Sequence, residues 1–75
     1  MEKSELLKRL EQVEEQVWHD MDLIARQRKI LAELDGKGVD IDAIKIMLVE
    51  MENLLDINLQ EREKLRAELA RLDGS

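Results

Sequence analysis

Residues 34–44 read LDGKGVDIDAI, and they hold the main interruption in a chain whose apolar residues otherwise follow a helical period. Gly36 and Gly38 can adopt the positive φ that ends a helix at little cost. Asp40 can accept the first free N–H groups of a second helix. The stretch therefore predicts that the chain reverses here and that two long helices lie side by side.

The expected boundaries follow from the signals on either side of this stretch. One helix should span about residues 4–35, with Ser4 as its N-cap, and the turn should span residues 36–39. The second helix should span about residues 40–72, with Asp40 as N-cap and with Val39 and Ile44 in the two positions of a hydrophobic staple. The whole chain, residues 1–75, then forms a single helical-hairpin domain.

Both predicted helices carry an apolar seam whose members are three or four residues apart, as in coiled coils. If the chain folds back at Lys37 and Gly38, residue i faces roughly residue 75 − i, and the two seams come into register. The seam residues of the first helix are Leu6, Leu10, Val13, Val17, Ile24, Leu31 and Leu34, and those of the second are Ile41, Ile44, Leu48, Met51, Leu55, Leu65, Leu69 and Leu72.

The halves of both helices next to the turn carry more apolar residues than one seam can bury. Each large apolar side chain left in water forgoes roughly 1.5–3 kcal/mol, and a contiguous exposed strip usually marks an interface. We expect a second copy to cover it, so that two hairpins form a four-helix bundle. The predicted dimer interface comprises Trp18, Met21, Leu23, Ala25, Ile30, Ile46, Met47, Val49, Leu54, Ile57 and Leu59.

Two alternatives to the homodimer remain. A bent or loosely packed monomer would leave these side chains partly exposed, and a groove could instead receive a helix of another protein. The length favours association, because a domain of 75 residues without cysteine rarely buries enough apolar surface alone.

Four polar residues interrupt the apolar seams: Asp20, Gln27, Asn58 and Arg62. Buried polar residues fix register and orientation in coiled coils, and this is the role we expect for them. Gln27 and Arg62 can also lean out to water or to a neighbouring Glu. The functional alternative is a polar pocket for a small ligand.

The charge argues against several classes of function. The chain has 12 Lys and Arg against 18 Asp and Glu, a formal net charge of −6, whereas a surface that follows nucleic-acid phosphates is basic. An anionic membrane surface is disfavoured for the same reason. No apolar run is long enough to span a bilayer and no signal-peptide core is present, so we expect a cytoplasmic protein.

The chain offers little for catalysis or metal binding. His19 is the only histidine, Gln16 stands where a Glu-x-x-His motif would need Glu, and cysteine and threonine are absent. The Gly36-Lys37-Gly38 segment lacks the Lys-Ser or Lys-Thr of a phosphate-binding loop. The sequence therefore predicts a non-enzymatic protein without cofactors or metal ligands.

From His19 onward, several residues resemble a group of uncharacterised small helical-hairpin proteins of rhizobia and related alphaproteobacteria. They are Ile24-Ala25-Arg26-Gln27-Arg28, Ile30, Leu34, Gly38-Val39-Asp40, Leu48, Glu52, Arg62, Leu65, Glu68 and Leu69. Members of that group often carry a histidine near the position of Asn58, from which this chain departs. The resemblance implies a bacterial cytoplasmic hairpin and no particular activity. A designed hairpin is the other origin considered, and the irregular Trp18, Asp20, Gln27 and Asn58 argue against it.

The sequence thus predicts an all-α antiparallel helical hairpin that pairs into a four-helix bundle. Its predicted function is that of a homodimeric interaction protein, such as a small regulator or adaptor that binds another protein. The alternative is a nucleic-acid-binding regulator that resembles the plasmid copy-number RNA-binding hairpin dimers, against which the acidic charge argues.

Overall fold

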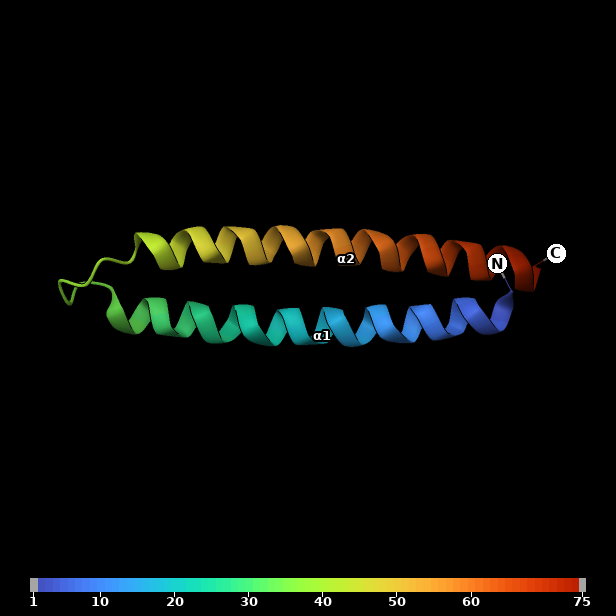
Figure 1. Ribbon diagram of the computed structural model, residues 1–75, viewed down its shortest axis with the longest axis horizontal. Coiled ribbons are helices and arrows are strands. Elements are labelled where there is room, and N and C mark those ends of the chain that lie inside the picture. The colour runs from blue at the N-terminus through green and yellow to red at the C-terminus, as the bar shows by residue number, and fades with distance from the viewer. Residues whose placement is uncertain (1, 75) are drawn as a thin grey trace.

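The computed structural model describes residues 2–74, and within them the chain forms two helices and no strand. Helix α1 spans Lys3–Leu34 and helix α2 spans Asp42–Gly74. They run antiparallel along their full length, with the turn at one end and both ends of the chain at the other (Figure 1). The molecule is a rod with extents of 59 × 15 × 14 Å. The predicted all-α helical hairpin is confirmed.

The start of α1 differs from the predicted Ser4 cap. The helix begins at Lys3 after Glu2, whose side chain makes no capping hydrogen bond. Ser4 therefore lies inside the first turn, where Glu5 complements the positive end of the helix dipole. A run of strong helix formers starts at the beginning of the chain, so the helix extends to Lys3 without a side-chain cap.

Helix α1 ends in a type II turn over residues 34–37. The Lys37 N–H donates to the Leu34 carbonyl at 3.1 Å. Asp35 has φ −63° and ψ 129°, and Gly36 has φ +81°. A type II turn requires positive φ at its third residue, which glycine alone adopts without steric cost. Gly38 also has positive φ, +75°, so both glycines act as predicted.

Helix α2 starts two residues later than predicted, at Asp42. The Lys45 N–H donates to the Ile41 carbonyl at 3.0 Å, which makes Ile41 the N-cap. Asp40 still caps the helix through its side chain, because its Oδ1 accepts the Asp42 N–H at 3.0 Å. The predicted Val39–Ile44 staple is wrong, because an N-cap at Ile41 places neither residue in a staple position. Val39 is half exposed.

The core is a single seam between the helices. Its buried members among residues 2–74 are Leu6, Val17, Ile24, Leu48 and Leu65, of which Leu6 and Val17 are fully buried. Most other seam residues are half-buried, because each is covered by only one neighbouring helix. Five buried side chains in a chain of this length make a thin core.

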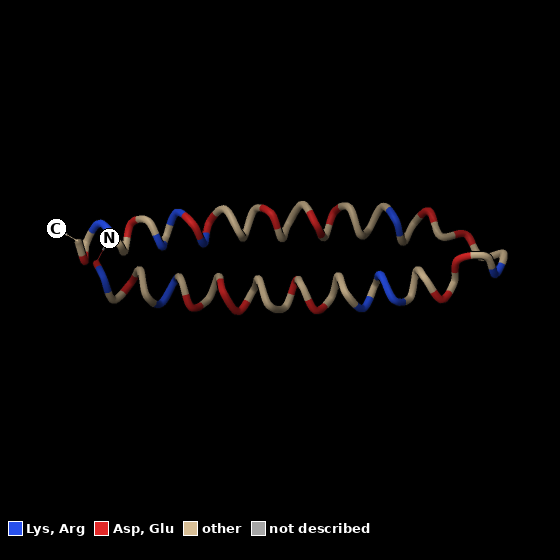
Figure 2. Tube along the Cα trace, turned by 180° about the vertical axis from the view of Figure 1, so that it is seen from behind, with Lys and Arg blue, Asp and Glu red and all other residues tan. Residues whose placement is uncertain are grey.

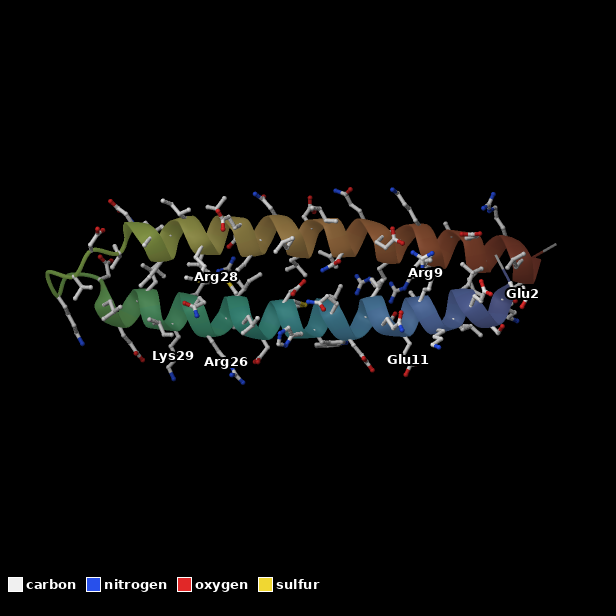
Figure 3. The ribbon with its side chains drawn as sticks, in the orientation of Figure 1. Glu2, Arg9, Glu11, Arg26, Arg28 and Lys29 are labelled. Atoms are coloured by element: carbon white, nitrogen blue, oxygen red, sulfur yellow. The ribbon has the colours of Figure 1, made fainter. Side chains whose placement is uncertain are left out.

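Polar contacts across the seam fix the register. Among residues 2–74, four ion pairs join the helices: Lys3–Asp73 at 2.6 Å, Arg28–Glu52 at 2.5 Å, Glu14–Arg66 at 2.9 Å and Arg9–Glu61 at 3.7 Å. Figure 3 shows Arg9 and Arg28 reaching toward α2, while Glu11, Arg26 and Lys29 point away from it. Every pair lies within about one and a half helical turns of the predicted register of 75 − i.

Candidate interaction surface

The two helices form a flat pair, so the hairpin has two broad sides. In the heptad notation abcdefg, the seam residues occupy positions a and d. In an antiparallel pair, the e positions of both helices flank one edge of the seam, and the g positions of both helices flank the other edge. The ion pairs agree with this geometry: Arg28–Glu52 and Glu14–Arg66 join e positions, and Arg9–Glu61 joins g positions. The additional apolar side chains are divided between these two sides.

One of the two surfaces, here called the g-side strip, consists of Leu23 and Ile30 of α1 with Met47, Leu54 and Ile57 of α2. The first four are consecutive g positions in the half of each helix next to the turn, and Ile57 occupies the adjoining c position. Leu23 is half-buried, whereas Ile30, Leu54 and Ile57 have 40%, 57% and 60% of their surface exposed. No charged g position interrupts this part of either helix.

The opposite surface, the e-side patch, consists of Trp18, Met21 and Ala25 of α1 with Val49 and Leu59 of α2. Trp18 is 71% exposed and Val49 56%, while Leu59 is half-buried. The helical period places Met21 midway between Glu14 and Arg28, and Leu59 midway between Glu52 and Arg66. Met21 and Leu59 therefore lie between two cross-helix ion pairs, whereas Val49 lies on the turn side of Glu52.

An open groove of about 290 Å³ lies on this e side. Met21, Ile24, Ala25 and Leu55 line it, together with the side chains of the Arg28–Glu52 ion pair. Its floor is apolar because Ile24 and Leu55 belong to the seam. The groove is suited to accept an apolar side chain, and the residues that line it do not form a catalytic group.

The predicted dimer interface is therefore not one strip. Its residues separate into the g-side strip and the e-side patch, with Ile46 in the f position farthest from α1 and 61% exposed. A flat partner cannot cover both sides at once. Sequence counting found the excess of apolar residues, and only the register across the helices divides it into two surfaces.

The four polar seam residues fall into two groups. Asp20 and Asn58 meet across the seam, where Asn58 Nδ2 donates to Asp20 Oδ2 at 2.8 Å and Gln16 Nε2 donates to Oδ1 at 2.8 Å. Gln27 is half-buried, and its side chain makes no hydrogen bond to another described residue. Arg62 is half-buried, and its Nε is buried without a hydrogen-bond partner among residues 2–74.

The cross-helix ion pairs are the interactions that sequence reasoning missed. Glu14–Arg66 and Arg28–Glu52 each place opposite charges at facing e positions. The signal was present in the sequence, because assigning heptad positions to both seams and pairing e with e would have matched these charges.

His19 is exposed on the outer surface of α1. Among residues 2–74, no group of three or more His, Asp or Glu side chains is placed to hold a metal ion. Neither helix in the described part of the chain combines the length and apolar character needed to cross a bilayer. Within residues 2–74, neither helix carries a long basic stretch, and no Lys or Arg lies between Arg9 and Arg26 or between Lys45 and Arg62, so the middle of both helices is acidic (Figure 2).

Comparison of the chain with protein-family models, curated proteins and solved structures finds no match. The resemblance to rhizobial hairpin proteins stays a prediction.

Proposed function

We propose that this protein is a non-enzymatic interaction module that acts as a homodimer, with two hairpins paired in a four-helix bundle. The observation that carries the proposal is the exposure of large apolar side chains in the turn-proximal half of both helices, outside the seam. Surfaces of this kind mark protein–protein contacts. The paired hairpins would in turn present a rigid, acidic outer surface to another protein, as a small regulator or adaptor does.

The thin core supports a second copy as the first partner. Five buried side chains among residues 2–74 leave a lone hairpin close to the limit of stability. A chain that depends on association for stability needs its partner whenever it folds, and another copy is present wherever the chain is made. Association between copies would bury surface that water covers in the lone chain.

The test is the molar mass in solution, measured by light scattering after size-exclusion chromatography over a hundredfold range of concentration. We expect a mass of twice 8.8 kDa at the upper end of the range. The double variant Ile46→Glu with Ile57→Glu should yield monomers or an unfolded chain. A monomeric wild-type chain at high concentration would overturn the proposal.

The adaptor role has its own test. The purified dimer is immobilised and exposed to extract of the native host, and each captured protein is assayed again in isolation with the wild-type chain. A protein that binds the folded dimer directly would support this role, and its absence would limit the proposal to self-association. The alternative of nucleic-acid binding gains no support from the described surface, where the middle of both helices is acidic (Figure 2).

A further inference from the structure

We propose that the second copy packs on the g-side strip with its turn at the same end of the bundle as the first, so that the twofold axis runs along the rod. This inference rests on the proposed homodimer and specifies its face and orientation. It follows from the order of the g-position side chains along the two helices.

The g positions change character midway along each helix. They read Arg9, Gln16, Leu23 and Ile30 along α1, and Met47, Leu54, Glu61 and Glu68 along α2. Apolar side chains thus lie in the half next to the turn, and polar or charged side chains lie in the half next to the chain ends. The two halves of this side are therefore chemically unlike.

Two twofold arrangements can bring the g sides of two hairpins face to face. With the turns at the same end, each α1 lies antiparallel to α2 of the partner. With the turns at opposite ends, each helix lies antiparallel to its own copy. These arrangements pair different residues across the interface, so the order of the g positions discriminates between them.

The same-end arrangement matches every layer of g positions. In the half next to the turn it pairs apolar side chains, Ile30 with Met47 and Leu23 with Leu54. In the other half it pairs an amide or basic side chain with an acidic one, Gln16 with Glu61 and Arg9 with Glu68. Each α1–α2 contact between copies then repeats the antiparallel relation that the helices already have within one chain.

The opposite-end arrangement, with full overlap, mismatches every layer. It sets Ile30 against Arg9, Leu23 against Gln16, Met47 against Glu68 and Leu54 against Glu61. Each contact would desolvate a charged or amide group against an apolar side chain, which is unfavourable. A slide to half overlap would restore apolar contact, but it would halve the shared length of the rods.

The e side is a less favourable surface than the g side for packing a second copy. Its turn-proximal half contains the Arg28–Glu52 ion pair, and the Glu14–Arg66 pair lies on the other side of the e-side patch. These side chains are 39–63% exposed, so a covering hairpin would have to remove their water. Desolvation of ion pairs offsets the gain from apolar burial. The g side also carries one ion pair, Arg9–Glu61 at 3.7 Å, but this pair lies in the half away from the turn and not within the g-side strip.

The arrangement can be measured by distances between identical spin labels, because the chain contains no cysteine. Two single variants are labelled separately: Lys37→Cys at the turn and Glu5→Cys near the other end. Same-end packing predicts that both label pairs lie within about 30 Å, since neighbouring helices are about 8–10 Å apart.

The other arrangements give different pairs of distances at a helical rise of about 1.5 Å per residue. Full opposite-end overlap predicts about 55 Å between the labels at the turns. Opposite-end packing with half overlap predicts a label distance of about 30 Å for Lys37→Cys at the turns but about 65 Å for Glu5→Cys. Either result overturns the orientation while the homodimer stands. A monomeric mass overturns both proposals.

The face is tested by two matched substitutions. Leu54→Lys lies in the g-side strip and Val49→Lys in the e-side patch, and the two original side chains are 57% and 56% exposed. We expect Leu54→Lys to raise the Kd of the dimer by about 30-fold or more and Val49→Lys to change it by less than about threefold. The reverse order would assign the second copy to the e side and overturn the inference.

Discussion

The hydrogen bond between Asn58 and Asp20 joins two of the polar residues that interrupt the apolar seams. Its worth can be tested with a double-mutant cycle. Asn58→Leu should destabilise the fold by about 1–3 kcal/mol, because Asp20 keeps a part-buried carboxylate oxygen without its amide partner. Adding Asp20→Leu should recover most of that loss and can exceed wild-type stability. Chemical denaturation at one chain concentration measures both.

The cycle has a clear contrary outcome. If the two single substitutions simply add, the hydrogen bond contributes nothing and the polar pair does not hold the register. The spin label at Lys37→Cys gives a second readout. A broader distribution of label distances in the Asp20→Leu, Asn58→Leu variant than in the chain with Lys37→Cys alone would show that the polar pair specifies one alignment.

The positive φ of Gly36 can be tested by substitution. Its positive φ belongs to the type II turn, and a Cβ built there meets nothing within 4 Å. Gly36→Ala should therefore cost about 1 kcal/mol through backbone strain alone. A synthetic chain with D-alanine at residue 36 should be at least as stable as wild type, because it favours positive φ and has fewer unfolded conformations. Equal destabilisation by both enantiomers would contradict this account.

At the scale of the helices, the cross-helix ion pairs should contribute little to stability. Glu14 and Arg66 are joined at 2.9 Å but remain 39% and 46% exposed. Exposed pairs contribute about 0.2–1 kcal/mol. A cycle of Glu14→Gln and Arg66→Gln should give a coupling energy within this range, and it should fall when salt is raised to 1 M. A coupling above about 2 kcal/mol would show that water is excluded from the e side.

Much of the helical architecture could be predicted from the sequence. The spacing of three or four residues between apolar positions placed all five buried residues of the described chain in the seam: Leu6, Val17, Ile24, Leu48 and Leu65. The exact helix ends were less predictable, since Lys3 starts α1 without a side-chain cap and Asp40 caps α2 from one residue before the N-cap. The division of the apolar surplus between two sides depends on pairing across helices, which counting along one helix does not show.

The proposed homodimer predicts that folding is coupled to association. We expect the helical signal at 222 nm to fall on dilution through the dimer's Kd, and the melting temperature to rise with chain concentration. The physical reason is that the lone hairpin buries only five side chains among residues 2–74. Circular dichroism over a hundredfold concentration range measures this. Helicity that stays constant while the mass halves would show that the hairpin folds by itself.

The Lys3–Asp73 contact of 2.6 Å joins the extremities of the two helices that lie at the end of the rod away from the turn. A short peptide bridge between those extremities should close the chain into a loop without altering either helix. Such a cyclised chain could then be opened at Lys37, where the backbone is exposed, to give a circular permutant with its helices in reversed order. Cargo fused to the new ends would then sit at the opposite end of the rod from cargo fused to the original ends.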